Sequence, residues 1–160
     1  MENTNLKSHF MKRAIELSLR NMTSNAGGPF GAVIVRQDKI VGEGWNQVTS
    51  SNDPTAHAEV MAIRNACANL NNFDLSDCEI YTSCEPCPMC LSAIYWARLK
   101  KIYFANTRKD AANIGFDDDL IYQEIPKELD QRLIPMLPLE REEALKVFSI
   151  WQSKADKTEY

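Results

Sequence analysis

The chain lacks both an apolar run long enough to cross a membrane and a run of basic residues. A membrane-spanning helix needs about 20 predominantly apolar residues in succession, and no such stretch occurs in the 160 residues. The polar N-terminus lacks the apolar h-region of a secretory signal peptide, so the sequence predicts no leader. Lysine and arginine total 18 against 22 acidic residues, and the net charge is −4. Nucleic-acid binding relies on basic residues that neutralise phosphates, so this balance favours a small neutral substrate.

Repeats, low-complexity segments and Gly- or Pro-rich linkers are also missing. A chain of 160 residues without linkers predicts a single domain, 1–160, that can bury a core of its own. The five cysteines are odd in number, and three of them lie within residues 84–90. This distribution favours a metal site in a reducing compartment over a disulfide framework, so we expect a cytoplasmic protein.

Apolar periodicity predicts helices and strands that alternate along most of the chain. The predicted elements are a helix at 5–23, a strand pair at 30–36 and 40–45, a helix at 54–70, a strand at 79–83, a helix at 87–98, a strand at 101–105, an edge strand at 133–139 and a helix at 140–154. This order is typical of an α/β protein and predicts a three-layer α/β/α sandwich on a mixed five-stranded sheet. Residues 108–131 are polar and read as a solvated loop, with a lid over a pocket as the functional alternative.

One imidazole, two thiols and a carboxyl group form a pattern with a chemical meaning. His57 and Glu59 lie in the run Thr-Ala-His-Ala-Glu, and Cys87 and Cys90 lie in the run Pro-Cys-Pro-Met-Cys. This is the His-x-Glu…Pro-Cys-x-x-Cys signature of zinc-dependent nucleobase deaminases. Three protein ligands leave one tetrahedral position open for water, whose pKa zinc lowers to about 7. Glu59 is then the predicted catalytic residue, which moves protons between the water and the substrate.

The spacing of these residues constrains where the metal can lie. Residues two apart do not share a helix face, so His57 and Glu59 can approach one metal only near a helix end. Asp53 as the N-cap and Pro54 as the first helical residue would provide such an end. A second helix that starts near Cys87 would point another N-terminus at the site, and helix N-termini favour thiolates.

A purely structural zinc site is the main alternative. Cys84, Cys87, Cys90 and His57 could close a Cys₃His quartet, but Glu59 would then have no role. Cys84 is also expected on the preceding strand, where its direction is unlike that of the other two cysteines. A non-catalytic zinc module therefore remains an alternative to the enzyme.

Several longer runs resemble bacterial guanine deaminases of the cytidine deaminase-like superfamily. The resemblance covers nearly the whole chain. It is carried by these runs: Gly27 to Val35 (GGPFGAVIV), Thr49 to Glu59 (TSSNDPTAHAE), Tyr81 to Arg98 (YTSCEPCPMCLSAIYWAR), Gly115 to Asp118 (GFDD), Ile121 to Ile125 (IYQEI) and the terminal Glu159 and Tyr160. The zinc motif alone is shared by cytidine, cytosine, tRNA adenosine and guanine deaminases. The GGPFGAV run, the Trp after AIY and the GFDD run select the guanine branch.

The resemblance implies a fold, a reaction and a set of site residues. The implied enzyme is a hydrolase of purine metabolism that converts guanine to xanthine and ammonia and binds one zinc ion per subunit. His57, Cys87 and Cys90 would bind the metal, and Glu59 would carry protons to N3 and to the leaving amine as zinc-bound hydroxide adds to C2. The substrate-binding residues would be Phe30, Asn46, Trp96, Asp118 and Tyr160.

The resemblance also implies a homodimer whose subunits exchange C-terminal segments, here about 140–160, so that Tyr160 reaches the neighbouring active site. The choice between Asp117 and Asp118 as the pocket residue rests on the family match. Phe30 and Trp96 would read as core residues without it. Guanosine, cytosine and tRNA adenosine stay open as alternative substrates.

Overall fold

The computed structural model describes residues 4–116 and 118–160, which form two units, Met1–Asp119 and Leu120–Tyr160. The first unit alternates helices and strands as the periodicity predicts. Its elements are α1 (Thr4–Thr23), β1 (Gly31–Arg36), β2 (Lys39–Trp45), α2 (Val48–Ser51), α3 (Ala58–Leu70), β3 (Glu79–Cys84), α4 (Pro88–Trp96), β4 (Lys101–Asn106) and α5 (Arg108–Asn113).

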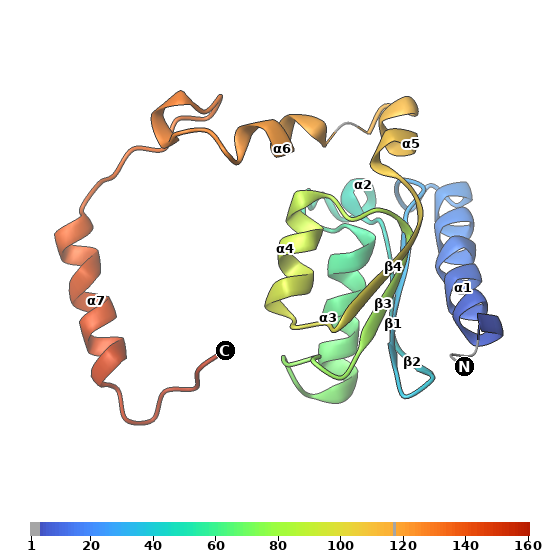
Figure 1. The fold of residues 1–160 in the computed structure, drawn as a ribbon, viewed down its shortest axis with the longest axis horizontal. Helices are drawn as coiled ribbons and strands as arrows, with labels where there is room; N and C mark the ends of the chain where they lie inside the picture. Colours follow the sequence, from blue (N-terminus) through green and yellow to red (C-terminus); the bar gives the residue numbers. More distant parts are fainter. Residues whose placement is uncertain (1–3, 117) are drawn as a thin grey trace. The chain divides into compact units, whose positions relative to one another are not determined.

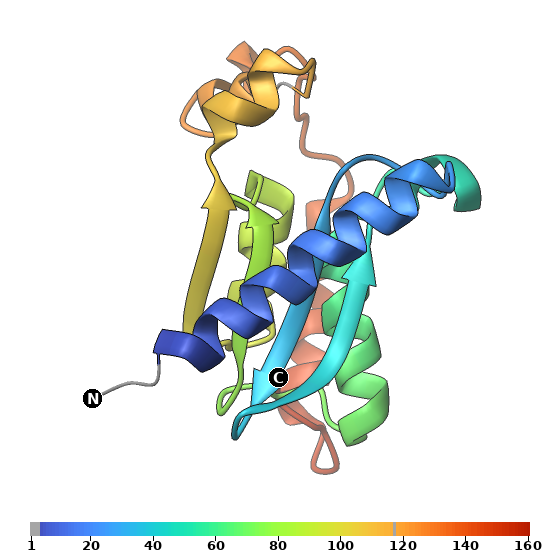
Figure 2. The ribbon, with the colours of Figure 1, turned by 90° about the vertical axis from the view of Figure 1, so that its right-hand side faces the viewer.

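The sheet of the first unit is mixed and lies between two helical layers. Its strand order is β2-β1-β3-β4, in which β1 is antiparallel to both β2 and β3 whereas β3 and β4 are parallel. Helix α1 covers one face, and α3 and α4 cover the other (Figures 1 and 2). The predicted α/β/α layering and the mixed sheet are confirmed. The sheet has four strands among the described residues, where five were predicted.

The missing strand is the one predicted at 133–139, and that prediction is wrong. These residues adopt no regular secondary structure, and the apolar side chains of Leu133, Ile134 and Leu137 are exposed. Pro135 and Pro138 remove two backbone donors from a segment of seven residues, so a ladder along it would be incomplete. An alternating apolar pattern therefore does not specify a strand by itself, because the backbone must also supply the donors of the ladder.

The second unit consists of short helices and one longer helix. Helix α6 (Asp119–Glu124), which starts at the last residue of the first unit, is followed by a 3₁₀ turn (Leu129–Gln131) and α7 (Arg141–Ser153). The predicted C-terminal helix is therefore confirmed, whereas the predicted loop at 108–131 contains α5, α6 and the 3₁₀ turn. Apolar side chains of α7 are exposed, namely Val147, Phe148 and Ile150.

Two apolar cores, one on each face of the sheet, hold the first unit together. Ala32 and Ile34 of β1 face α3 and α4, whereas Val33 and Val35 face α1, because successive strand residues point to opposite faces. All four are buried, as expected for a strand that is covered on both sides. No helix in residues 4–116 and 118–160 combines the length and the apolarity that a membrane crossing requires.

Strand β2 and helix α3 lie in unusually close contact because both present their smallest residues. A Cβ added to Gly44 would lie 2.2 Å from the carbonyl oxygen of Ala58, and one added to Gly42 would lie 2.5 Å from that of Ala62. Real Cβ atoms do not approach backbone atoms so closely, so both positions require glycine. This packing sets the position of the first turn of α3 relative to the sheet.

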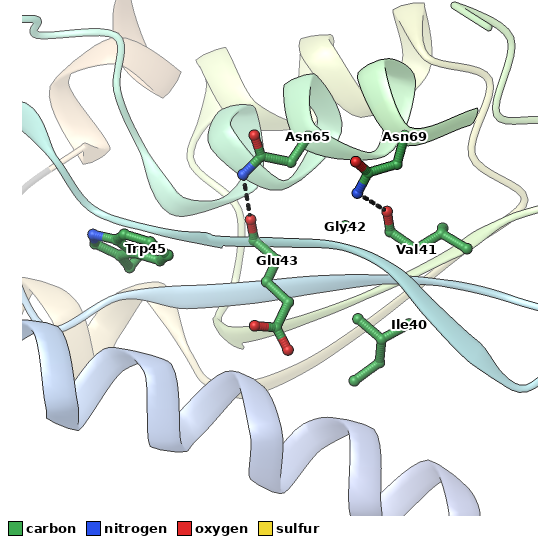
Figure 3. A pocket seen from close by; sticks show the side chains of 7 residues that line it. All are labelled: Ile40, Val41, Gly42, Glu43, Trp45, Asn65 and Asn69. Carbon is green, nitrogen blue, oxygen red and sulfur yellow. Dashed lines mark hydrogen bonds between the residues drawn. The ribbon is translucent and has the colours of Figure 1, made fainter. Parts of the chain in front are cut away.

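The outer side of β2 bears a shallow open groove of about 410 Å³ (Figure 3). Two asparagines of α3 reach across it to the strand. Asn65 Nδ2 donates to the carbonyl oxygen of Glu43 at 2.7 Å, and Asn69 Nδ2 donates to that of Val41 at 2.9 Å (Figure 3). None of the residues lining this groove belongs to the predicted site.

Candidate metal centre

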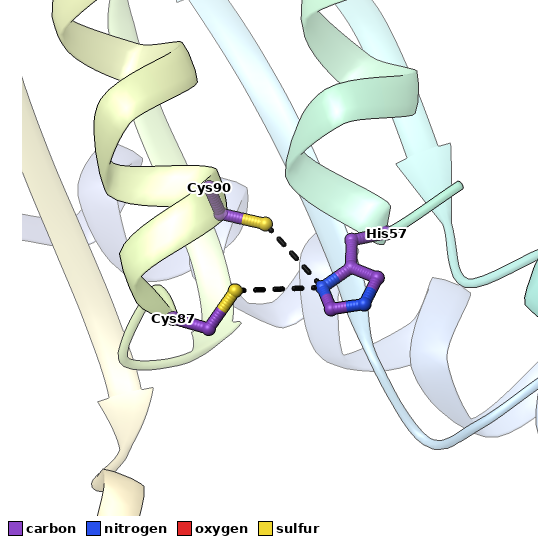
Figure 4. Close-up of side chains that lie close together, drawn as sticks. All are labelled: His57, Cys87 and Cys90. Atoms are coloured by element: carbon purple, nitrogen blue, oxygen red, sulfur yellow. Dashed lines mark hydrogen bonds between the residues drawn. The ribbon is translucent and has the colours of Figure 1, made fainter. Parts of the chain in front are cut away.

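Three side chains from two helix starts converge in the first unit. His57 Nδ1 lies 3.6 Å from Cys87 Sγ and 3.5 Å from Cys90 Sγ (Figure 4). Zinc bonds of about 2.3 Å to sulfur and 2.0 Å to nitrogen, at a tetrahedral angle, would separate N from S by about 3.5 Å. The donor set and its spacing therefore fit a zinc ion. The three ligand atoms lie within 4.8 Å of one another, and they form the cluster found among the described residues.

Both helices begin at a residue of this cluster. His57 is the N-cap of α3 with extended backbone angles (φ −72°, ψ 155°), and Cys87 is the N-cap of α4 (φ −66°, ψ 168°) with Pro88 at the first helical position. Neither residue uses its side chain as a cap, so both side chains are available to a ligand. Both predicted ligands therefore lie at helix N-termini, as the spacing argument expects, and a metal at this place stays a prediction.

The predicted start of the first of these helices is wrong by four residues. Asp53 does not act as an N-cap, because its Oδ1 accepts hydrogen bonds from the backbone N–H of Thr55 at 2.8 Å and from its hydroxyl at 2.7 Å. This local turn holds Pro54 and Thr55 outside the helix, as such aspartate side chains often do. The turn brings His57, in place of Asp53, to the helix N-terminus.

The pKa values of the two cysteines shift in opposite directions. A hydrogen bond from Cys90 lowers the pKa of Cys87 to about 4, whereas the same hydrogen bond, followed by burial, raises the pKa of Cys90. The thiolate of Cys87 in turn raises the pKa of His57 through a hydrogen bond. The lowered pKa favours the thiolate form of Cys87, which is the form that binds a metal ion.

Glu59 lies beside the cluster without belonging to it. Its side chain is in the first turn of α3 and only 6 % exposed, and Thr82 of β3 donates a hydrogen bond to its Oε1 at 3.4 Å. Burial raises the pKa of this carboxyl group. Buried carboxyl groups with raised pKa values are suited to take up and release protons. The sequence offered no signal for Thr82, because a lone threonine in a strand is ordinary.

Cys84 lies outside the ligand cluster. Its thiol donates to the carbonyl oxygen of Thr107 at 3.6 Å, and burial raises its pKa to about 11. The residues described by the structure thus bring three metal ligands together, and Cys84 is not a fourth. This geometry disfavours the structural Cys₃His quartet.

The predicted pocket residues Phe30 and Asn46 lie side by side at the open end of the β1–β2 hairpin, where the N–H of Asn46 donates to the carbonyl oxygen of Phe30 at 3.1 Å. Asn46 is 6 % exposed, and its Oδ1 accepts from the backbone N–H groups of Gly28 at 3.1 Å and Val48 at 3.2 Å. These two donors identify which amide atom is oxygen and leave Nδ2 as the group able to meet a ligand. Phe30 contacts Phe116 edge-to-face, with ring centroids 4.8 Å apart.

Asp118 lies near the cluster, whereas Trp96 does not. Burial, and then the charge of Cys87, raise the pKa of the half-buried Asp118. Trp96 is the last residue of α4 and 70 % exposed. At 1.5 Å per residue it lies about 13 Å along the helix from Cys87. Tyr160 belongs to the second unit and is exposed, and Asp117 lies outside the described residues.

Comparisons with known proteins show similarity both over the part of the chain with the His-Cys-Cys cluster and over nearly its full length. Residues 4–106 match the family model of the cytidine and deoxycytidylate deaminase zinc-binding region. Guanine deaminase of Bacillus subtilis (strain 168) is 54% identical over 151 residues, which cover 94% of this chain and 97% of that protein. The X-ray structure of guanine deaminase from Bacillus subtilis superposes with a TM-score of 0.93 at 53% identity, covering 96% of this chain and 98% of that one.

A relative with another substrate class is also similar. The tRNA-specific adenosine deaminase of Buchnera aphidicola subsp. Schizaphis graminum is 41% identical over 107 residues, which cover 67% of this chain and 70% of that protein. Similarity over this part of the chain is thus shared by relatives with different substrates, so it does not by itself identify the substrate.

Proposed function

The chain belongs to the cytidine and deoxycytidylate deaminase zinc-binding family, and we infer that within this family it is a guanine deaminase, which hydrolyses guanine to xanthine and ammonia. The main support for this conclusion is that the similarity to the Bacillus subtilis guanine deaminase extends over 94% of this chain. The family model ends at residue 106, the last residue of β4, whereas that likeness includes most of residues 107–160 as well. The net charge of −4 further disfavours an RNA substrate.

We propose that each subunit binds one zinc ion through His57, Cys87 and Cys90. The spacing of one nitrogen and two sulfur donors fits zinc, and three ligands leave an open coordination position. When bound there, zinc would act as a Lewis acid that supplies hydroxide at neutral pH. The remaining chemistry falls to side chains of this chain.

Glu59 is proposed to carry the protons of the reaction. Its buried carboxylate would accept a proton from the attacking water and deliver it to N3 of guanine as C2 is attacked. It would then take the proton of the new hydroxyl group on C2 and pass it to the amino group, so that ammonia leaves and the C2 carbonyl of xanthine forms. Burial supports this role, since it raises the pKa of the carboxyl group above its ordinary value and so favours the protonated form. Thr82 restrains the carboxyl group by its hydrogen bond to Oε1.

The base would be held by residues from separate segments. Asn46 can donate from Nδ2 to an acceptor of guanine, and Asp118 can accept from its N–H groups. Phe30 offers an aromatic face, and stacking of a base on an aromatic side chain contributes about 1–3 kcal/mol in nucleic-acid systems. The resemblance alone assigns Trp96 to the pocket. Its position at the end of α4 distant from Cys87 does not support this assignment.

The assay that tests the function is ammonia release from the zinc-loaded chain. Guanine, guanosine, cytosine, adenine and a tRNA anticodon stem-loop form the panel, and release from guanine alone is expected. Glu59→Gln should lower the turnover number by about 10²–10⁴ while zinc content stays unchanged. The surface variant Glu16→Gln serves as the matched control. Preference for guanosine or RNA would overturn the substrate assignment, and an inert chain with zinc bound would favour a structural site.

We further propose a cytoplasmic homodimer in which residues 140–160 are exchanged, so that Tyr160 of one subunit completes the pocket of the other. The exposed apolar side chains of α7 support a partner for this segment. Co-refolding Glu59→Gln with Tyr160→Ala provides the test. Exchange would combine an intact Glu59 with an intact Tyr160 in one of two sites and restore activity. Without exchange both sites carry a defect, and activity would stay low.

A further inference from the structure

Helix α5 is bound directly to the loop that carries the metal ligands. The backbone N–H of Glu85, two residues before Cys87, donates to the carbonyl oxygen of Asn106 at 2.8 Å. The carboxylate of Glu85 in turn accepts from the backbone N–H of Arg108 at 3.0 Å, in the first turn of α5. Thr107 and Asp110 close a capping box at the same end of the helix. The position of α5 thus follows that of the metal site.

The other end of α5 turns sharply at Gly115. The N–H of Gly115 donates to the carbonyl oxygen of Ala112 and that of Phe116 to the carbonyl oxygen of Ala111, each at 3.0 Å. This pair of hydrogen bonds is a Schellman motif, which places a left-handed residue just after the helix. Gly115 has φ +92°, a conformation that side-chain-bearing residues rarely adopt.

The turn brings Phe116 against Phe30. The two rings are nearly perpendicular, at 88°, with centroids 4.8 Å apart. A Cβ added to Gly28 would lie 3.2 Å from Cζ of Phe116, so the second ring occupies the space that glycine leaves there. Asp118 follows two residues later in the sequence. The turn at Gly115 therefore positions an aromatic partner of Phe30 close in sequence to this acidic residue.

We propose that Phe116 is a positioning residue for the purine base, which acts by holding the ring of Phe30 in the orientation that stacks on guanine. This inference rests on the proposed function, since it assigns Phe30 to the base pocket. Phe116 is 43 % exposed, so its ring contributes little to the apolar core. Core packing therefore does not account for the ring, whereas its contact with Phe30 does.

A double-mutant cycle on the KM for guanine tests the proposal. An edge-to-face pair is worth roughly a 2- to 10-fold change in an equilibrium, so Phe116→Ala should raise KM by about that factor with a smaller change in kcat. In the Phe30→Ala background the same change should have almost no further effect, because Phe116 acts through Phe30. Phe73→Ala, which removes an exposed ring from the loop after α3, is the matched control.

The outcomes separate the positioning role from the function itself. Wild-type chain without guanine turnover would overturn the proposed function and this inference with it. Turnover with strictly additive effects of the two variants, or with an unchanged KM in Phe116→Ala, would overturn the positioning role alone. Gly115→Ala provides a second variant, since it strains the turn without touching either ring, and it should raise KM in the same direction while zinc content stays constant.

Discussion

Replacing Gly44 with alanine should displace the start of α3 and weaken the metal site. The added methyl group would lie 2.2 Å from the carbonyl oxygen of Ala58 and 2.4 Å from the nitrogen of Ala62. Both are backbone atoms of a helix, so the clash cannot be relieved by a side-chain rotation. Since His57 immediately precedes Ala58, the imidazole must move with the first turn of α3.

The expected loss of stability follows from this overlap. Forcing a methyl group into a packed contact costs about 1–3 kcal/mol, and the lower backbone entropy of alanine in the unfolded chain returns about 0.4–1 kcal/mol. A net loss of about 1–2 kcal/mol corresponds to a fall in Tm of roughly 5–10 °C for a unit of this size. Gly42→Ala, which meets the backbone of Ala62 and Ala66, should cost a similar amount.

Zinc affinity distinguishes the two variants. Gly44→Ala disturbs the turn next to His57 and should weaken zinc binding by roughly 10-fold, the scale of a misplaced ligand, whereas Gly42→Ala acts further along α3 and should leave affinity closer to the wild type. Thermal unfolding of the zinc-free protein, followed by circular dichroism, gives the Tm of each variant. Competition with a chromophoric chelator gives the zinc affinity. A Gly44→Ala variant that melts at the wild-type temperature would refute the close-packing argument.

Three further substitutions test other parts of the structure. Cys84→Ser should keep a full complement of zinc by atomic absorption, since its thiol donates to the carbonyl of Thr107, and loss of zinc would revive the structural quartet. Asn46→Asp should raise KM for guanine in steady-state assays with little change in Tm, because an aspartate still accepts from both backbone N–H groups but cannot donate to the base; an unchanged KM would exclude Asn46 from the pocket. The Arg13 hydrogen bond lowers the pKa of Glu43 below its ordinary 4.5, so this pair stabilises the fold above pH 4.5 and loses its effect as the pH falls through the lower folded value. The Tm difference between wild type and Glu43→Gln should therefore shrink in acid, and a difference that persists at pH 2 would contradict the assignment.

The elements of the sheet could be predicted because their signals are local. The apolar run at 30–36 predicted a strand paired with the one at 40–45, and the turn residues Gln37 and Asp38, both with positive φ, fit this hairpin. The start of α3 could not be predicted in the same way. The pair Asp53 and Pro54 suits a helix N-terminus and an isolated turn equally well, and the hydrogen bonds to Thr55 decide in favour of the turn.

The metal ligands were predictable and their surroundings were not. His57, Cys87 and Cys90 follow a spacing that has few other uses, and the structure gathers them as expected. Phe116 belongs to the GFDD run of the resemblance, but the sequence predicted no role for its ring, because one aromatic residue in a polar stretch looks like part of a solvated loop. Its partner Phe30 is distant in the chain, and only the three-dimensional structure brings the two rings together.

The two asparagines that reach from α3 to β2 also bear on how the folded chain behaves at high concentration. An exposed outer strand is a template for intermolecular β-pairing, which leads to aggregation. Here a strand from another molecule would meet carbonyl groups of Val41 and Glu43 that already accept hydrogen bonds from Asn69 and Asn65. Recruitment along this side of the sheet must first break both hydrogen bonds, so the asparagine side chains act as a barrier to sheet extension.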